Sequence, residues 1–215
     1  AAAAVRSVYL IAVEEQGERR AVGTAFGVRP EGLLATAAHV ALELKKGGLL
    51  PPGTDARALA VRTDSDGEGR VVVGARLHPA FEAGSFLNDV ALLQLAPGPP
   101  LEALRLARRA ELARLRRGIP LASFGFPFPS TDVWRPRGRL TQDVLGDIRG
   151  ERYLEVGLGI VPGTSGSPIF IRDGVVVGIV LGGDFPEGAE DGWKWPRGVN
   201  WGLSVAPLRE MLEAE

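Results

Sequence analysis

Three side chains in this sequence could together carry out acyl transfer: the imidazole of His39, the carboxylate of Asp89 and the hydroxyl of Ser165. A serine hydroxyl is a weak nucleophile at neutral pH, so it needs a base to take its proton and a carboxylate to orient that base. The order His, Asp, Ser along the chain is one of three orders that unrelated folds use for these groups. The pattern predicts that Ser165 is a nucleophile, that His39 is its base and that Asp89 orients His39.

The chain has 2 histidines, so His78 is the other candidate for the base. His39 follows Ala37 and Ala38, whose small side chains allow other groups to approach the ring closely. An alternative interpretation makes His39 a packed or surface histidine and Asp89 a turn or cap residue. However, Asp89 begins an apolar segment, where an unpaired carboxylate would be costly to bury. We therefore predict that His39 and Asp89 form a pair.

Glycines flank Ser165, which would let a substrate carbonyl approach the backbone closely. Glycine at position 163 also permits a backbone conformation that is strained for other residues. In such a loop the backbone N–H groups of Gly163 and Ser165 would point at the negative oxygen that develops during acyl transfer. The alternative is a plain turn of glycine and serine. We predict an oxyanion hole formed by these two N–H groups.

Three motifs, in this order, resemble those of trypsin-like serine peptidases. Thr36 to His39 resembles the TAAH box of that family, Asn88 to Leu92 resembles its NDVAL strand, and Gly163 to Pro168 resembles its GxSGxP loop. The resemblance spans nearly the whole chain, and in motif it is closest to bacterial glutamyl endopeptidases and HtrA-type protease domains. It implies a serine endopeptidase that forms an acyl-enzyme on Ser165, and it implies that His78-Pro79 is a structural dipeptide.

Two positions depart from the family pattern. Thr164 stands where chymotrypsin has an aspartate that pairs with a new N-terminus during activation, and where related bacterial enzymes commonly have asparagine. Threonine cannot form that ion pair, so we expect no activation by an inserted N-terminus. Val180 stands where glutamyl endopeptidases use a histidine to recognise an acidic side chain. We therefore expect no strict specificity for glutamate.

The resemblance also implies where the substrate pocket lies. Its walls are expected at Ile160, Val161, Val180, Leu181, Gly182 and Asn200. Gly159 falls where trypsin has the aspartate that binds basic side chains, so a neutral apolar pocket is expected, with cleavage after small or hydrophobic residues. The backbone of Val180 to Gly183 is expected to offer an open strand edge to an extended peptide. The segment 184–197, with Trp193 and Trp195, is expected to form a surface flap.

Short apolar or alternating runs bounded by Gly, Pro or Asp are typical of antiparallel strands, and about six of them lie on each side of a middle segment. We predict an all-β fold of two packed six-stranded antiparallel β-barrels with a short C-terminal helix. The barrel with His39 and Asp89 is expected within residues 1–117, and the barrel with Ser165 within residues 118–215. The helix, from Ala206 to Glu215, is expected to pack on the second barrel.

The middle segment, residues 97–117, is rich in arginine. Its arginines are Arg105, Arg108, Arg109, Arg114, Arg116 and Arg117. We interpret it as a solvated linker that crosses between the two barrels. The alternative is a basic docking surface.

The composition narrows the possible functions. A chain of 215 residues with 45% hydrophobic content can bury a substantial core. The net charge of −1 gives no electrostatic case for a nucleic-acid partner, and the lack of cysteine excludes disulfides and thiolate metal sites. No apolar run approaches the roughly 20 residues needed to span a bilayer. We expect protein or peptide substrates and neither a metal nor an organic cofactor, and the family resemblance favours a periplasmic or secreted location.

Two other functions remain open from the sequence. Thr164 could disturb the oxyanion loop, which would leave an inactive protein that keeps the fold and binds partners. The same triad also cleaves esters, so an esterase-type acyl hydrolase is a further alternative. Gly163 to Ser167 lacks the fifth-position glycine of the α/β-hydrolase elbow, which argues against that particular class of esterase.

Overall fold

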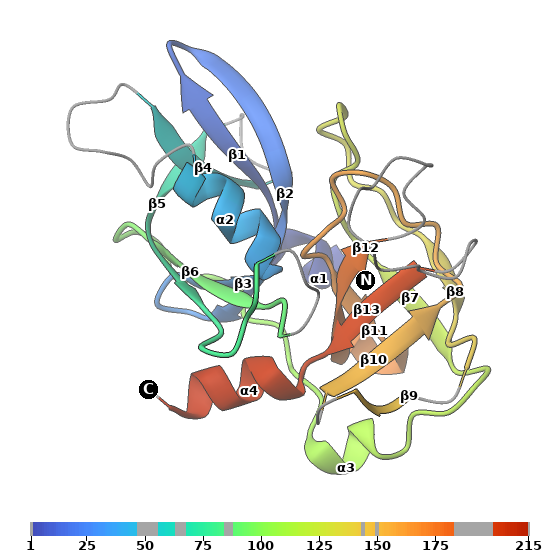
Figure 1. Cartoon of the computed structure of the whole chain (residues 1–215). Helices are drawn as coiled ribbons and strands as arrows, with labels where there is room; N and C mark the ends of the chain where they lie inside the picture. Colours follow the sequence, from blue (N-terminus) through green and yellow to red (C-terminus); the bar gives the residue numbers. More distant parts are fainter. Residues whose placement is uncertain are drawn as a thin grey trace.

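A computed structural model shows how these elements are arranged, and the chain is mostly β (Figure 1). The structure describes residues 2–46, 56–62, 68–83, 88–142, 145–148, 151–182 and 200–214. A closed barrel forms from the first part of the chain, and a curled sheet forms from the second part. The two units pack side by side, with the segment between them running along both.

The closed barrel is antiparallel, and its neighbouring strands follow the order β1-β2-β3-β6-β5-β4. Its strands are β1 (Val8–Glu15), β2 (Glu18–Arg29), β3 (Leu33–Thr36), β4 (Arg57–Arg62), β5 (Gly69–Leu77) and β6 (Ala91–Leu95). Pairing of β1 with β4 closes the barrel, with Leu10 opposite Val61. Closure removes the free strand edges that would otherwise invite pairing with another chain.

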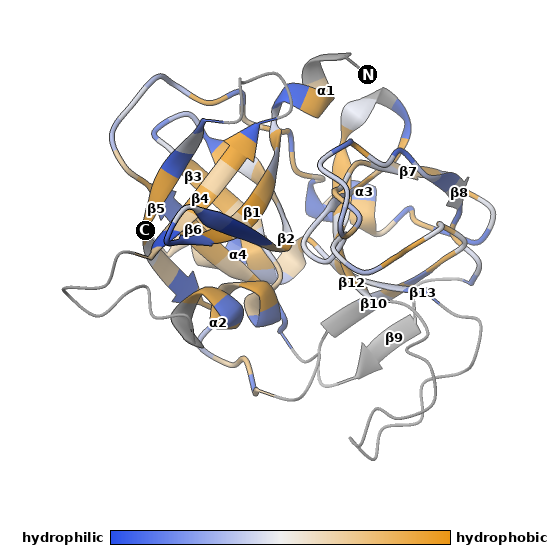
Figure 2. Ribbon diagram, turned by 90° about the horizontal axis from the view of Figure 1, so that it is seen from above, coloured by the Kyte–Doolittle hydropathy of each residue, from blue (hydrophilic) through white to orange (hydrophobic). Residues whose placement is uncertain are grey.

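Both faces of β1 are buried from Val8 to Val13, which explains the uninterrupted apolar run over these residues. Tyr9 and Ile11 belong to a cluster inside the closed barrel. Val8 and Leu10 belong to a second cluster, which also contains residues of the curled sheet such as Ile179. Successive side chains of a strand point to opposite faces, so one strand serves both clusters. Figure 2 shows the hydrophobic colouring of the strands, and the shared cluster holds the two units together.

The second sheet is also antiparallel, and its strands follow the order β8-β7-β11-β12-β13-β10-β9. Its strands are β7 (Pro120–Ser123), β8 (Arg137–Arg139), β9 (Leu145–Ile148), β10 (Glu151–Val156), β11 (Pro168–Phe170), β12 (Val176–Gly182) and β13 (Asn200–Ser204). An isolated bridge between Leu140 and Val156 curls the sheet back on itself. The predicted fold class is confirmed, and the second unit is a curled sheet of the described strands rather than a ring of six.

The helices are short and lie at the ends and edges of the sheets. They are α1 (Ala2–Arg6), α2 (Ala38–Lys46), α3 (Arg109–Leu112) and α4 (Ala206–Glu213), with the 3₁₀ turn η1 (Arg172–Gly174). Helix α2 directly follows β3, and it buries Val40, Ala41 and Leu44 against the barrel. These residues recur at helical spacing, so one face of α2 is apolar. That packing fixes the start of α2, where His39 lies.

The C-terminal helix α4 joins the two units. It contacts β10 of the curled sheet, as expected, and its last turn also reaches the closed barrel. The guanidinium of Arg29 on β2 donates to the carbonyl oxygen of Leu212 at 2.5 Å, and that of Arg76 on β5 donates to the carbonyl oxygen of Met211 at 3.1 Å. Carbonyls of a last helical turn have no partner within the helix, and cations are favoured there.

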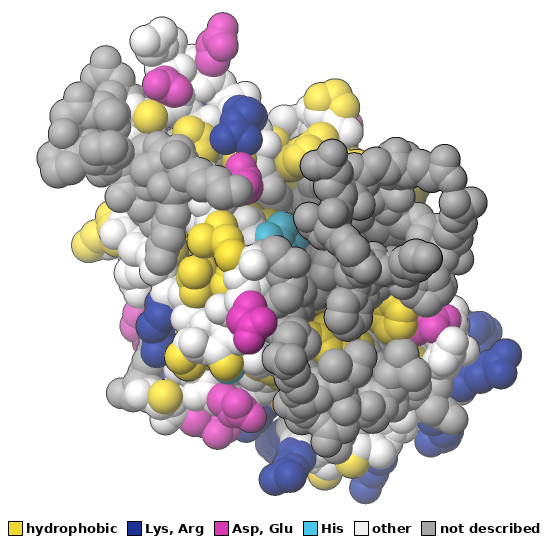
Figure 3. Space-filling view, viewed as in Figure 1, with side chains coloured by type: hydrophobic (Ala, Val, Ile, Leu, Met, Phe, Trp, Pro, Cys, Tyr) yellow, Lys and Arg dark blue, Asp and Glu magenta, His cyan; other side chains and the backbone are white. Residues whose placement is uncertain are grey.

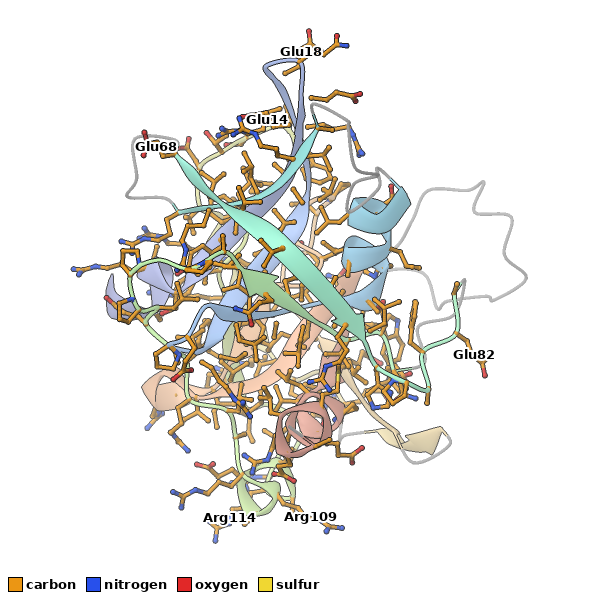
Figure 4. All side chains as sticks on the ribbon, turned by 90° about the vertical axis from the view of Figure 1, so that its left-hand side faces the viewer. Glu14, Glu18, Glu68, Glu82, Arg109 and Arg114 are labelled. Carbon is orange, nitrogen blue, oxygen red and sulfur yellow. The ribbon has the colours of Figure 1, made fainter. Side chains whose placement is uncertain are left out.

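The arginine-rich segment runs along both units. The amide of Leu104 donates to the Gly27 carbonyl at 2.8 Å, and the amide of Ala107 donates to the Val176 carbonyl at 2.8 Å. In Figure 4 the labelled side chains of Arg109 and Arg114 point outward, at the opposite end of the molecule from Glu14 and Glu18. This arrangement fits the interpretation of the segment as a solvated connection.

One arginine of this segment forms an ion pair within it. Both terminal nitrogens of Arg105 bond the carboxylate of Glu111 at 3.0 Å. Those bonds, with a further one from the backbone N–H of Arg108, lower the pKa of Glu111 to about 2. The pair therefore stays charged throughout the physiological pH range.

Among the described residues, no helix is both long enough and apolar enough to cross a membrane. Within the same ranges, no three His, Asp or Glu side chains gather in a group that could hold a metal ion.

Candidate active site

His39 and Asp89 form a pair with two contact points. The Nδ1 atom of His39 lies 2.6 Å from Oδ2 of Asp89, and the backbone N–H of His39 donates to Oδ1 at 2.8 Å. An ionised carboxylate only accepts hydrogen bonds, so Nδ1 carries the proton and Nε2 is left as the acceptor. Asp89 therefore selects the tautomer that a general base needs, and it also satisfies a free N–H group in the first turn of α2.

The pair lies across a boundary between the interior and the surface. The side chain of Asp89 is fully buried, whereas 37% of the His39 side chain is exposed. Figure 3 shows a histidine side chain reaching the surface of this face. Burial lowers the pKa of His39, but the charge and hydrogen bond of Asp89, together with the charge of Glu43, raise it by more. The net result is a pKa above the ordinary histidine value.

The backbone before Asp89 turns sharply. Asn88 has a φ of +49°, a region that non-glycine residues seldom adopt and that asparagine tolerates better than most. Its side-chain amide donates to the Ala80 carbonyl at 3.4 Å. The turn directs the chain into the buried residues Val90 and Ala91, so the carboxylate of Asp89 enters the interior where His39 meets it.

Ser165 lies in a tight loop between β10 and β11. Gly163 has a φ of +96° and Gly166 a φ of +87°, so both occupy the left-handed region that favours glycine. A Cβ atom on Gly166 would lie 2.1 Å from the carbonyl oxygen of Thr24 and 2.3 Å from the hydroxyl oxygen of Thr36. The glycines therefore let the loop press directly against the closed barrel, and Ser165 remains half-buried.

The peptide planes of this loop are held so that two N–H groups stay available. The Pro162 carbonyl accepts from the amide of Phe128 at 2.9 Å, and the Thr164 carbonyl accepts from the amide of Ser167 at 3.0 Å. In a trans peptide the N–H points away from the carbonyl. The N–H groups of Gly163 and Ser165 thus face the other side, and neither donates to a backbone carbonyl within the described part of the chain.

Thr164 supplies its own support for this loop. Its side chain is buried, and its hydroxyl donates to the Val161 carbonyl at 2.7 Å. The backbone N–H of Thr164 donates to the same carbonyl at 3.1 Å. A threonine at this position therefore closes the turn from Val161 to Thr164 locally. The sequence did not reveal this role of Thr164, because the role depends on the folded turn that brings the Val161 carbonyl to the Thr164 hydroxyl.

Close packing at Gly23 brings the nucleophile loop to the start of α2. A Cβ atom on Gly23 would lie 2.7 Å from both γ carbons of Val40, the residue after His39, and 3.2 Å from the carbonyl oxygen of Ser165. Only glycine fits between the two segments. The structure thus packs both the His39 end of α2 and the Ser165 loop against one glycine.

The hydroxyl of Ser165 donates to the Leu181 carbonyl at 3.0 Å. Leu181 is an extra residue in the pairing of β12 with β13, since Val180 lies opposite Gly202 and Gly182 lies opposite Trp201. Such a bulge redirects the local backbone. It explains how a carbonyl of β12 meets the nucleophile, a contact that the sequence did not predict.

Some of the expected pocket residues are less accessible than predicted. The side chains of Val180 and Leu181 are both 1% exposed. The Val180 amide donates to the Ser167 carbonyl and its own carbonyl accepts from Gly166, both at 2.8 Å. The prediction of an open edge starting at Val180 is therefore wrong, because the nucleophile loop already occupies that backbone. Gly183 and the segment 184–197, with its tryptophans, lie outside the described residues.

The other described residues of the predicted pocket, Ile160, Val161 and Asn200, are uncharged. Ile160 is half-buried, and the side chain of Val161 is 38% exposed. The side-chain amide of Asn200 donates to the Leu158 carbonyl. The indole N–H of Trp134 donates to the Gly159 carbonyl at 2.9 Å. Trp134 was not among the predicted site residues, since nothing in its local sequence marks it.

His78 lies in a separate turn after β5. Its Nδ1 atom accepts from the backbone N–H of Ala80 at 3.2 Å, and its backbone N–H donates to the Val90 carbonyl at 3.0 Å. Asp89 directs both of its oxygens at His39. The contacts of His78 are therefore those of a turn-stabilising residue.

Comparison with known proteins agrees with this geometry. Residues 23–179, well over half of the chain, match the family model described as the trypsin-like peptidase domain. No curated protein matches the sequence. A structure of the HtrA-type protease AlgW with a decapeptide has a TM-score of 0.70 and 17% identity, and the match covers 99% of this chain and 65% of that chain.

A second AlgW structure, with a tripeptide, has a TM-score of 0.66 and 21% identity, and the match covers 99% of this chain and 61% of that chain. The chain thus spans less than two thirds of the length of these proteins, and at such identities the likeness is one of fold. The family match rests on the sequence itself and includes His39, Asp89 and Ser165. The chain therefore belongs to the trypsin-like peptidase family.

Proposed function

We propose that this protein is a serine endopeptidase that cleaves peptide bonds through an acyl-enzyme on Ser165. The observation that carries the proposal is the two-point contact of Asp89 with His39, beside the loop that presents Ser165. Asp89 holds the proton on Nδ1, so Nε2 is the ring nitrogen that accepts a proton in general-base catalysis. The family match supports the same reaction class.

In the first step Oγ of Ser165 attacks the carbonyl carbon of the scissile bond while its proton passes to Nε2 of His39. The hydroxyl must first turn from the Leu181 carbonyl toward His39, a rotation about the Cα–Cβ bond of Ser165. The tetrahedral oxyanion is stabilised by the N–H groups of Gly163 and Ser165. Asp89 stabilises the imidazolium that forms.

Collapse of this intermediate breaks the C–N bond, and Nε2 of His39 gives its proton to the leaving amine. Water then repeats the sequence: His39 takes its proton, the hydroxide adds to the ester carbonyl, and Ser165 leaves with the proton returned. The chemistry thus requires only side chains and N–H groups of this chain. The proposed roles rest on the contact of Asp89 with His39 and on the loop of Ser165, which packs against the same part of the closed barrel.

We further propose that the enzyme prefers small or hydrophobic residues before the scissile bond. The described pocket wall offers Ile160 and Val161, and position 159 is a glycine. A charged substrate side chain would lose its hydration there without a partner charge. A hydrophobic side chain would gain free energy from the same burial.

A covalent probe for activated serines tests the proposal. A fluorophosphonate should label the native chain at Ser165, as located by mass spectrometry, and should not label Ser165→Ala. Ser167→Ala is the matched control, since the hydroxyl of Ser167 is buried and finds no hydrogen-bond partner among the described residues. Labelling that survives in Ser165→Ala would place the nucleophile elsewhere and overturn the proposal.

A further inference from the structure

We infer that Thr24 is a positioning residue whose hydroxyl holds the nucleophile loop in its catalytic geometry from the opposite unit. The inference rests on the proposed function for its kinetic consequence. Thr24 lies on β2 of the closed barrel and is fully buried. It stands 15 residues before His39 and far from Ser165 in sequence, outside the three motifs that contain His39, Asp89 and Ser165.

Thr24 makes four hydrogen bonds, two through its backbone and two through its side chain. Its backbone N–H donates to the Ser165 carbonyl at 2.9 Å, and its carbonyl accepts from the hydroxyl of Thr36 at 2.7 Å. Thr36 ends the strand that leads to His39. The backbone of one residue thus contacts the nucleophile on one side and the segment that carries the base on the other.

The hydroxyl of Thr24 forms two hydrogen bonds with residues of the second unit. It donates to the Gly163 carbonyl at 2.9 Å and accepts from the amide of Phe126 at 3.1 Å. A hydroxyl has one donor and can accept as well, so both of these bonds come from a single oxygen. Any residue could make the two backbone bonds, but only a hydroxyl-bearing side chain of this length can make the other two.

These two side-chain bonds bear on the orientation of the Gly163 N–H. Phe126 begins the short segment whose Phe128 amide holds the Pro162 carbonyl at 2.9 Å. The Pro162 carbonyl and the Gly163 N–H belong to one peptide plane, and the Gly163 carbonyl belongs to the next. The hydroxyl of Thr24 therefore fixes the peptide plane that contains the Gly163 carbonyl directly. It fixes the plane that contains the Gly163 N–H indirectly, through the segment from Phe126 to Phe128.

Removal of the hydroxyl leaves two buried groups without a partner. Thr24→Val keeps the shape of the side chain but orphans the Phe126 N–H and the Gly163 carbonyl. Buried polar groups without partners are costly, so the loop should move to regain them. Because catalytic geometry is sensitive to shifts of about 1 Å, such movement should reduce turnover roughly tenfold to hundredfold. Thr24 is fully buried and is not itself part of the proposed pocket wall, so KM should change less than kcat.

The first test follows the loop itself by hydrogen exchange. Native chain, Thr24→Val, Thr24→Ser and Thr141→Val are compared, with exchange read for peptides that cover residues 161–168. Thr141 is the matched control, because its hydroxyl also bonds a carbonyl, that of Glu155 at 3.0 Å, away from the nucleophile loop. We expect the amides of Gly166 and Ser167 to exchange about ten times faster in Thr24→Val alone.

The second test uses kinetics. In Thr24→Val, kcat on a cleaved peptide should fall tenfold to hundredfold with KM within about threefold, and Thr24→Ser should restore kcat to within threefold of the native value. Unchanged hydrogen exchange in the loop of Thr24→Val would overturn the inference. Equally faster exchange in every peptide of the protein would also overturn it, because that result indicates general destabilisation. Faster loop exchange with native kcat would overturn its catalytic part. If the native chain cleaves no peptide, the proposed function fails, and the exchange data alone decide whether Thr24 holds the loop.

Discussion

Asp89 holds His39 by two different groups, its ring at Nδ1 and its backbone N–H. The distances are 2.6 Å and 2.8 Å, and the carboxylate is fully buried. One side chain therefore fixes both the tautomer of the ring and the start of the helix that carries it. This double role makes Asp89 sensitive to a change as small as the replacement of an oxygen by an NH₂ group.

Asp89→Asn should lower kcat by about 10⁴-fold while the protein stays folded. An amide can donate to Nδ1, which would push the proton to Nε2 and leave no acceptor for the Ser165 proton. Steady-state kinetics on a peptide substrate measure the effect. Asp132→Asn, at an exposed loop position, serves as the control and should behave as the native chain. A loss of less than tenfold in Asp89→Asn would contradict the assigned role.

The pH dependence of kcat/KM should report the raised pKa of His39. The base must be neutral to act, so kcat/KM should rise with pH through an apparent pKa above the ordinary value of 6.5. Glu43→Gln removes one of the charges that raise this pKa and should move the profile to lower pH. A profile centred below 6.5, or one unmoved in Glu43→Gln, would show that the titrating group has another environment.

The same shift links His39 to stability. A pKa raised by folding means that the folded state binds the proton more tightly than the unfolded state does. This contribution to the free energy of unfolding is fully present below pH 6.5 and is lost as the pH rises through the folded-state pKa. Chemical denaturation of native chain and His39→Gln at several pH values measures it. The difference between the two should shrink as the pH rises across that window.

The sequence was informative where chemistry constrains residue type. His39, Asp89 and Ser165 could be named because few side chains can serve as base, orienting acid and nucleophile, and the glycines at 163 and 166 stand where their φ values require them. The alternating apolar runs likewise predicted a mostly β fold.

Features that depend on tertiary contacts could not be predicted in this way. The bulge at Leu181 depends on the register of β12 against β13. The hydroxyl of Thr24 bonds residues more than 100 positions away, at Phe126 and Gly163. The open edge predicted at Val180 was wrong for a similar reason, since the loop that occupies it comes from another part of the chain.

Gly163→Ala should abolish most activity because the added Cβ would collide with neighbouring backbone. Gly118, which has a similar φ but open space around it, serves as the control for backbone strain alone. The Cβ of Gly163→Ala would lie 2.4 Å from the Phe126 carbonyl oxygen and 2.8 Å from the Phe128 amide nitrogen. The displaced loop should lose one oxyanion donor, which costs about 10² to 10³ in kcat. Gly118 has a comparable φ of +87° with no atom within 4 Å of an added Cβ.

Gly118→Ala should therefore cost about 1 kcal/mol in the free energy of unfolding and leave kcat unchanged. Thermal or chemical unfolding and steady-state kinetics of both variants separate the two effects. Equal kinetic losses in Gly118→Ala and Gly163→Ala would mean that strain, not the position of the oxyanion loop, accounts for the result.

Thr164 should make the loop independent of the N-terminus. Its hydroxyl closes the turn through the Val161 carbonyl at 2.7 Å. Thr164→Ser should stay active, whereas Thr164→Val should lose roughly tenfold in kcat because the turn loses the hydroxyl bond to the Val161 carbonyl. A chain extended by several residues before Ala1 should have native kcat and KM. A strong loss on extension would indicate that the N-terminus does take part in activation.

The central claim is that Ser165 is the nucleophile of a peptide-cleaving enzyme, and cleavage of a diverse peptide library tests it most directly. Native chain, Ser165→Ala and Ser167→Ala are incubated with the same library, and new termini are read by mass spectrometry. We predict cuts after small or hydrophobic residues with the native chain and Ser167→Ala, and none with Ser165→Ala. Turnover of ester substrates without any peptide cleavage between pH 6 and 9, or cuts that persist in Ser165→Ala, would contradict the account.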